Sequence, residues 1–205
     1  MKKTVICNIK MKGKTNKLVY PSTDRSLPTS DRAVIYPINA FLEKTIRSDD
    51  EITVVLLVKK DPIGDYQKNT DLFEEELLAA NENIGAKIVF KTVETEFNEE
   101  QSVHEELLGR IVDEIEDGAH ILADITFGPK DLPIILFSAL NFAEKFLGCE
   151  VDNLIYGQVN FQNEVPINPK ICDMVPLYCL YSITNTVRAE EPKRAREMLK
   201  SLLSI

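Results

Sequence analysis

The sequence predicts an α/β protein whose mostly parallel sheet carries helices on both faces. Short apolar runs rich in β-branched residues alternate with amphipathic helical stretches along the 205 residues. That order is typical of parallel strands joined by right-handed crossovers. The run 52–58 is almost wholly apolar and lies between polar clusters, as expected of a central strand buried on both faces. No repeat and no linker divides the sequence.

The expected elements follow one another as βαβαβαβαβ, and an extended segment and two C-terminal helices complete this Rossmann-like order. The strands are expected at 4–8, 52–58, 87–93, 120–124 and 151–156, with 159–162 and 165–171 as a further extended segment or a hairpin. Apolar residues at helical spacing predict helices at 32–47, 70–83, 103–115, 132–146, 174–188 and 192–203. Pro37 should kink the first helix or delay its start. The acidic stretch 94–101 is expected to be an exposed loop.

A polar corner at 126–131 lies between the strand 120–124 and the helix that begins at Leu132. In an open α/β sheet, ligands bind at the carboxyl ends of the strands. The start of the following helix offers free backbone N–H groups to an anion. The corner therefore predicts an anion site.

A basic loop follows the first strand. Residues 1–23 contain six lysines and no acidic residue, and the segment 10–17 has Gly13 at its centre. The loop carries neither the G-x-x-x-x-G-K-[ST] phosphate loop nor the G-x-G-x-x-G dinucleotide fingerprint. A local basic loop on a protein with net charge −9 suits a small anionic ligand, and the overall charge argues against long DNA or RNA.

Several classes of protein are not expected. No apolar run is long enough to cross a membrane, and the apolar stretch near the N-terminus is too short for a signal peptide, so we expect a cytoplasmic protein. The four cysteines are widely spaced and the two histidines, His104 and His120, lie far apart. We therefore expect no metal site and no cofactor.

The corner Asp124–Pro133, DITFGPKDLP, resembles the D-[IV]-T-H-[GS]-[FL]-R-x-x-P signature of CRISPR-associated Rossmann-fold (CARF) domains. It is similar in particular to the Csx-type accessory proteins of type III CRISPR systems. The downstream order is also similar, with DMVPL at 173–177 opening a helix. Phe127 stands where the family has histidine, and Pro129-Lys130 replaces an aromatic residue and arginine. The resemblance covers most of residues 1–190, and 191–205 is expected to be a C-terminal helix, too short for an effector domain.

The resemblance implies a homodimer that binds a cyclic oligoadenylate, cyclic tetra-adenylate in our reading, across its two-fold axis in antiviral signalling. Some CARF domains are also metal-independent ring nucleases, in which a ribose 2′-hydroxyl attacks the adjacent phosphate. We assign catalytic roles to Lys130 and Lys14, which would stabilise the developing charge, and to Asn8, which would position the ring. The expected ligand-binding residues are Lys10, Met11, Lys12, Gly13, Thr15, Thr126, Phe127, Gly128, Pro129 and Asp131.

Two alternatives stay open at this point. The chain could be a non-catalytic sensor that signals to an effector partner protein through the last helix, 192–203, whose apolar stripe includes Met198 and Leu202. It could also be an unrelated α/β protein that binds another nucleotide. Asp124 is expected to be a structural hydrogen-bond acceptor at the strand end, and His104 to be exposed and without a catalytic role.

Overall fold

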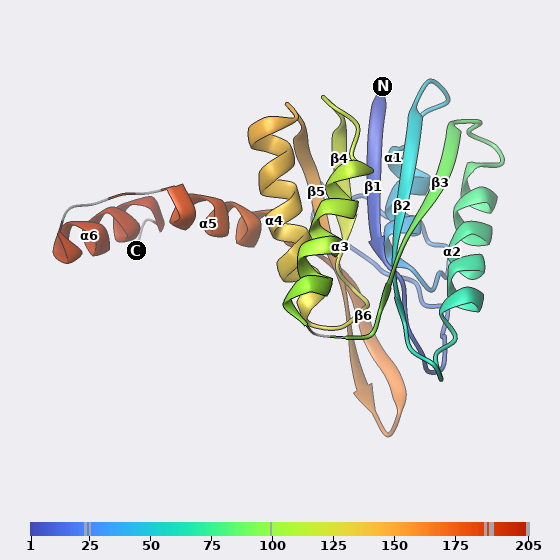
Figure 1. Ribbon diagram of the computed structural model, residues 1–205. Coiled ribbons are helices and arrows are strands. Elements are labelled where there is room, and N and C mark those ends of the chain that lie inside the picture. Colours follow the sequence, from blue (N-terminus) through green and yellow to red (C-terminus); the bar gives the residue numbers. More distant parts are fainter. Residues whose placement is uncertain (23, 25, 99, 187, 189–190, 204–205) are drawn as a thin grey trace. The chain divides into compact units, whose positions relative to one another are not determined.

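The structure is a computed structural model that describes residues 1–22, 24, 26–98, 100–186, 188 and 191–203. One six-stranded sheet has the order β3-β2-β1-β4-β5-β6, and helices cover both of its faces (Figure 1). β1 to β5 are parallel, and β6 runs antiparallel to β5. The predicted α/β fold with a mostly parallel, Rossmann-like sheet is confirmed.

The elements have these bounds. The strands are β1 (Lys2–Asn8), β2 (Glu51–Lys60), β3 (Lys87–Glu96), β4 (His120–Asp124), β5 (Glu150–Gln162) and β6 (Val165–Asp173). The helices are α1 (Pro37–Thr45), α2 (Tyr66–Asn81), α3 (Gln101–Asp113), α4 (Asp131–Phe146), α5 (Val175–Thr186) and α6 (Pro192–Leu203).

The order in which strands are added to the sheet reverses at β1. β2 and β3 lie on one side of β1, and β4 and β5 lie on the other. Such a point is called a topological switch point. Crossovers on the two sides of such a strand leave in opposite directions, so a crevice opens above its carboxyl end. β1 ends at Asn8 and β4 ends at Asp124. The two strands are neighbours in the sheet, and Cys7 of β1 pairs with Asp124 of β4. The basic loop and the polar corner are therefore neighbours, although more than a hundred residues separate them in the sequence.

The core lies on both faces of the central strands. On one face, the strand residues Val5, Cys7, Val54, Leu56 and Leu122 cluster with Ile38, Phe41 and Leu42 of α1 and with Phe73 and Leu77 of α2. The residues of opposite parity, such as Ile6, Val55 and Ile121, are equally buried and point to the other face. This two-sided burial explains why β2 is apolar almost throughout.

Pro37 delays the start of the first helix, which is one of the two effects that the sequence predicted. It is the first residue of α1, where its missing N–H would have had no helical partner. The prediction that the helix begins at residue 32 is wrong. Instead, Val34 forms an antiparallel bridge with Leu18, which ties the N-terminal connection to the segment before α1.

β3 and β5 continue past their predicted carboxyl ends, and β1, β2 and β6 are also longer than the sequence predicted. β3 continues through Glu96, because residues 94–96 pair with the carboxyl end of β2, so the loop expected at 94–101 is wrong for these residues. β5 continues to Gln162 and forms a hairpin with β6. The hairpin was one of the two alternatives that the sequence predicted for this region. Asn163 and Glu164, both with positive φ, make its turn. The hairpin extends past the carboxyl edge of the other strands (Figure 1).

The chain forms two compact units, Met1–Val175 and Pro176–Ile205. The first contains the whole sheet and α1 to α4. The second contains α6, in which none of the described side chains is buried. No helix in the described ranges is long and apolar enough to span a membrane.

Candidate functional site

A pocket of about 810 Å³ opens at the carboxyl edge of the sheet, beside the β5–β6 hairpin. Four of the predicted site residues line it, namely the expected ligand-binding residues Lys10, Thr126 and Phe127 and the expected catalytic residue Lys14. The loop after β1 and the corner after β4 therefore form one site. It lies in the crevice above the carboxyl end of β1, where ligands bind in open α/β sheets. The other lining residues are Asn16, Leu18, Tyr20, Ile35, Tyr156, Gly157, Val159, Phe161, Asn163, Glu164, Val165 and Pro166.

Lys10 is the cation held most firmly in the pocket. Its carbonyl accepts a hydrogen bond from Asn69 Nδ2 at 2.6 Å, which anchors the loop to α2. Its ammonium donates to the carbonyl of Lys14 and lies 5.7 Å from the centre of the Phe127 ring, within cation–π range. Burial lowers the pKa of Lys10, because the charged form is partly desolvated. A bound anion would offset that desolvation.

Phe127 connects the pocket to the core through a series of aromatic contacts. Its ring meets Tyr36 edge to face at 5.3 Å, and Tyr36 meets Phe73 in the same manner at 5.1 Å. The Tyr36 hydroxyl donates to the carbonyl of Asn69 at 2.9 Å, the residue that also holds Lys10. Phe127 is thus a fixed apolar wall of the pocket, at the position where the CARF signature that the corner resembles has histidine.

Asp124 holds the corner from below. The carboxylate is fully buried and accepts hydrogen bonds from the backbone N–H of Thr126 at 2.7 Å and of Ile38 at 3.2 Å. Burial raises the pKa of Asp124 to about 6, although both hydrogen bonds oppose the shift. Its position below the corner agrees with the structural role expected of it.

Thr126 and Gly157 join the corner to β5. The Thr126 hydroxyl accepts a hydrogen bond from the Gly157 N–H at 2.8 Å. A Cβ at Gly157 would lie 2.2 Å from Cγ of Pro37, so only glycine fits between β5 and the start of α1. This contact places Tyr156 and the hairpin beside the corner.

The residues at the start of α4 lie outside the pocket walls. Gly128 has φ of +90°, and a Cβ there would lie 2.8 Å from Leu132 Cδ1, so glycine is needed for the turn. Pro129 and the exposed Lys130 follow it, and neither is among the described residues that line the pocket. Asp131 forms an ion pair with the buried ammonium of Lys59 at 3.0 Å, so its carboxylate is already neutralised.

Asn8 is placed below the corner rather than at the pocket surface. It is fully buried, and a Cβ on Gly128 would lie 3.4 Å from its own Cβ. Neither polar atom of its side chain has a hydrogen-bond partner among the described residues. The catalytic role predicted for Asn8 would therefore require the 126–130 corner to move.

The middle of the basic loop points away from the pocket. Lys12 forms an ion pair with Asp61 at 3.0 Å, and the carbonyl of Met11 accepts from the Asp65 N–H at 2.8 Å. Met11, Lys12, Gly13 and Thr15 are absent from the described lining residues. This part of the basic loop, which was expected to bind ligand, therefore contacts the loop after β2.

The β5–β6 hairpin forms a wall of the site that was not predicted from the sequence. Tyr156, Phe161 and Val165 line the pocket and are 38%, 67% and 58% exposed. Large apolar side chains on the outward positions of a strand pair are an available signal in the sequence, but their use depends on knowing that the hairpin lies beside the corner. Neither the protein-family models nor the curated proteins include a match to this chain.

Proposed function

We propose that this chain is a CARF-type protein that binds a cyclic oligoadenylate, specifically cyclic tetra-adenylate, in type III CRISPR antiviral signalling. The observation that carries the proposal is the composition of the pocket at the switch point. Two lysines and the Thr126 corner share one cavity with the aromatic side chains of Phe127, Tyr156 and Phe161. The volume of about 810 Å³ falls in the usual range for small-molecule sites.

This combination suits a nucleotide rather than a simple anion. Lys10 and Lys14 supply positive charge for phosphates. Aromatic rings stack on bases of any sequence, which contributes about 1–3 kcal/mol per base. A ligand with several phosphates and several bases uses both kinds of side chain. That the ligand is cyclic and that its bases are adenine rests on the resemblance to the CARF signature.

A symmetric ring further suits a homodimer, in which each copy supplies the same half-site. The α4 helix offers a surface for such an interface. Its side chains Ile134, Phe142 and Phe146 are 68%, 41% and 70% exposed. Apolar groups of this size on one helix commonly mark an interaction surface.

We further propose that the protein is a ring nuclease. The ribose 2′-hydroxyl would lose its proton and attack the adjacent phosphorus, the bond to the 5′-oxygen would break, and the 5′-oxygen would take up a proton. The products are a 2′,3′-cyclic phosphate and a 5′-hydroxyl. Lys14 would stabilise the charge that develops on the phosphate oxygens, and Lys130, exposed at the start of α4, would contact the part of the ring outside the pocket.

The test is to incubate the protein with cyclic tetra-adenylate and cyclic hexa-adenylate, measure binding by calorimetry and identify products by mass spectrometry. Linear products with cyclic-phosphate ends support the ring nuclease. Tight binding without turnover supports the alternative, a sensor that signals through α6. Absence of binding to both rings contradicts both functions.

Charge substitutions locate the site. Lys10→Ala and Lys14→Ala should each weaken binding of cyclic tetra-adenylate by about tenfold at low salt, because a charge-assisted hydrogen bond contributes about 1.5–3 kcal/mol. Lys87→Ala is the matched control, since Lys87 pairs with Glu51 at the opposite edge of the sheet. Equal losses in all three variants would show that binding depends on overall charge and not on this pocket.

A further inference from the structure

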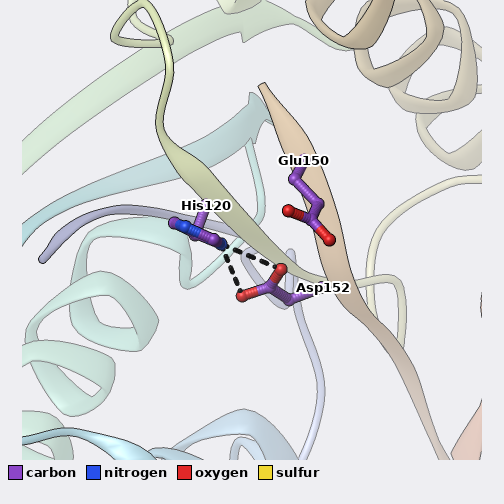
Figure 2. A group of neighbouring side chains, drawn as sticks. All are labelled: His120, Glu150 and Asp152. Carbon is purple, nitrogen blue, oxygen red and sulfur yellow. Dashed lines mark hydrogen bonds and ion pairs between the residues drawn. The ribbon is translucent and has the colours of Figure 1, made fainter. Parts of the chain in front are cut away.

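Three side chains that can bind a metal meet at the amino edge of the sheet. His120 is the first residue of β4, Glu150 is the first residue of β5, and Asp152 follows two residues later. Their side chains converge between the two strands (Figure 2). The pocket described above lies at the other ends of the same strands, so this cluster is separate from it.

The spacing of the donor atoms suits a bound ion. His120 Nδ1 lies 3.1 Å from both carboxylate oxygens of Asp152. One ligand atom from each of the three residues lies within 4.8 Å of the others. Two donors that each lie about 2.1 Å from a zinc ion are separated by roughly 3.0–3.5 Å. The His120–Asp152 pair already has this separation, and the exposed side chain of Glu150 lies beside it, with an oxygen within 4.8 Å of the other two ligand atoms.

A β-bulge brings Asp152 into the cluster. Ile121 pairs with Val151 and Leu122 pairs with Asn153, so Asp152 is an extra residue on β5 at this point. A bulge redirects the side chain at the inserted position. Here the redirected carboxylate faces His120 across the strand pair, as the dashed lines in Figure 2 show.

The cluster carries negative charge that the described part of the chain does not neutralise. No lysine or arginine among the described residues pairs with Glu150 or Asp152. The two lysines that begin β1 are committed elsewhere, Lys2 to Glu116 at 3.3 Å and Lys3 to Asp50 at 2.5 Å. About a third of the His120 and Asp152 side chains is exposed, so an ion can reach them from solvent.

We propose that His120, Glu150 and Asp152 bind a divalent transition-metal ion, Zn²⁺, with water completing the coordination. One imidazole and two carboxylates form a mixed nitrogen and oxygen set, which suits zinc or manganese better than calcium or magnesium. No sulfur contributes, because the neighbouring Cys149 is buried and its thiol donates to the Glu116 carbonyl at 3.3 Å. The bound ion cross-links the amino ends of β4 and β5.

The two histidines of the chain provide a direct test by NMR. Substoichiometric Mn²⁺, which is paramagnetic, should broaden the imidazole resonances of His120 and leave those of His104 sharp. His104 lies at the carboxyl side of the sheet, with Nε2 3.5 Å from Asp131. Excess Zn²⁺ should then displace Mn²⁺ and sharpen the His120 signals. Equal broadening of both histidines, or of neither, would overturn the proposal.

Variants extend the test to affinity. His120→Ala and Asp152→Asn should each weaken Zn²⁺ binding at least about tenfold, since even outer-shell partners of a metal contribute that much. His104→Ala is the matched control and should bind zinc as the wild type does. Zinc should also raise the melting temperature of the wild type and of His104→Ala but not of Asp152→Asn. Unchanged affinity in Asp152→Asn, with a native circular dichroism spectrum, would contradict the site.

Discussion

The carboxyl group of Asp124 is buried at the point where β4 ends, and it holds two segments of the chain by accepting from the N–H groups of Thr126 and Ile38. One of these segments is the corner that forms the pocket, and the other is the start of α1. An ionised carboxylate at this depth is costly, yet both hydrogen bonds favour the ionised form. The balance raises the pKa of Asp124 to about 6.

This raised pKa predicts a specific pH dependence of stability. The folded state binds the Asp124 proton more tightly than the unfolded state, whose pKa is about 4, so the contribution of this group is largest at low pH and is lost as the pH rises through about 6. A shift of about two pKa units corresponds to about 3 kcal/mol. Between about pH 4 and pH 7, the free energy of unfolding of Asp124→Asn should therefore rise by up to ~3 kcal/mol relative to wild type, as measured by urea denaturation.

Asp117→Asn is the control for that experiment, because Asp117 is exposed in the turn before β4. Its pH profile should run parallel to that of the wild type. Parallel profiles for Asp124→Asn as well would show that the buried carboxyl does not titrate in this range.

The Thr126 hydroxyl gives a second prediction at the level of one residue. Thr126→Val keeps the shape of the side chain but leaves the buried Gly157 N–H without its acceptor. An unpaired buried donor costs about 1–3 kcal/mol, and we expect that loss in thermal or urea unfolding. Thr126→Ser retains the hydroxyl and should recover most of it. A valine variant as stable as the serine variant would show that the hydrogen bond is not needed.

Individual site residues were predictable where the local sequence determines their position. Lys10, Lys14, Thr126 and Phe127 follow strand ends and line the pocket together. Asp131 is different because its partner is Lys59, at the end of another strand. Lys12 likewise pairs with Asp61. Such contacts depend on which strands are neighbours, and no local pattern contains that information.

The β5–β6 hairpin forms one wall of the pocket, and β5 closely approaches the start of α1. Gly157 of β5 faces Pro37 at the start of α1, where an added Cβ would come within 2.2 Å of the proline ring. Gly157→Ala should therefore destabilise the fold by about 1–3 kcal/mol, as overpacking usually does, and should also weaken ligand binding. Differential scanning calorimetry and ligand titration measure the two effects.

Gly109→Ala in α3 is the matched control, because nothing lies within 4 Å of a Cβ added there. Alanine is the better helix former by about 1 kcal/mol, so this variant should be as stable as the wild type or more so. If Gly157→Ala is equally harmless, β5 and α1 are not in close contact.

At the level of elements, the sequence predicted all twelve helices and strands found among the described residues, with β4 and α6 correct to the residue, because apolar periodicity and turn residues are local signals. The carboxyl ends of β2, β3, β5 and β6 were not predicted. Residues 94–96 are Glu-Thr-Glu, which has no apolar side chain, and they are strand because they pair with β2. The helix predicted from residue 32 fails for a similar reason, since Val34 pairs with Leu18 in preference to forming a helical turn before Pro37.

At the level of the whole molecule, strand order decides what the protein brings together. Alternating strands and helices predicted a parallel sheet, but the sequence does not contain the order in which the strands lie. That order places the ends of β1 and β4 at one edge and the starts of β4 and β5 at the other. The His120 cluster could not be found by searching for ligand spacing along the chain, because its members come from two neighbouring strands.

The proposed homodimer can be tested through the outward face of α4. Phe142 and Phe146 lie side by side there, with ring centres 4.8 Å apart, and both are exposed. If a second copy covers these rings, Phe142→Glu would place a charge in an apolar interface, where an unpaired carboxylate is strongly disfavoured. Sedimentation equilibrium should then show a dimer for the wild type and a monomer for the variant. In the proposed dimer each copy would supply half of the ring site, so the monomer should also bind cyclic tetra-adenylate at least about tenfold more weakly. Ile63→Glu makes the same change at an 80% exposed apolar residue in the loop after β2, and it should leave both the dimer and the affinity unchanged. A dimer that persists in Phe142→Glu would exclude this face of α4 as the interface.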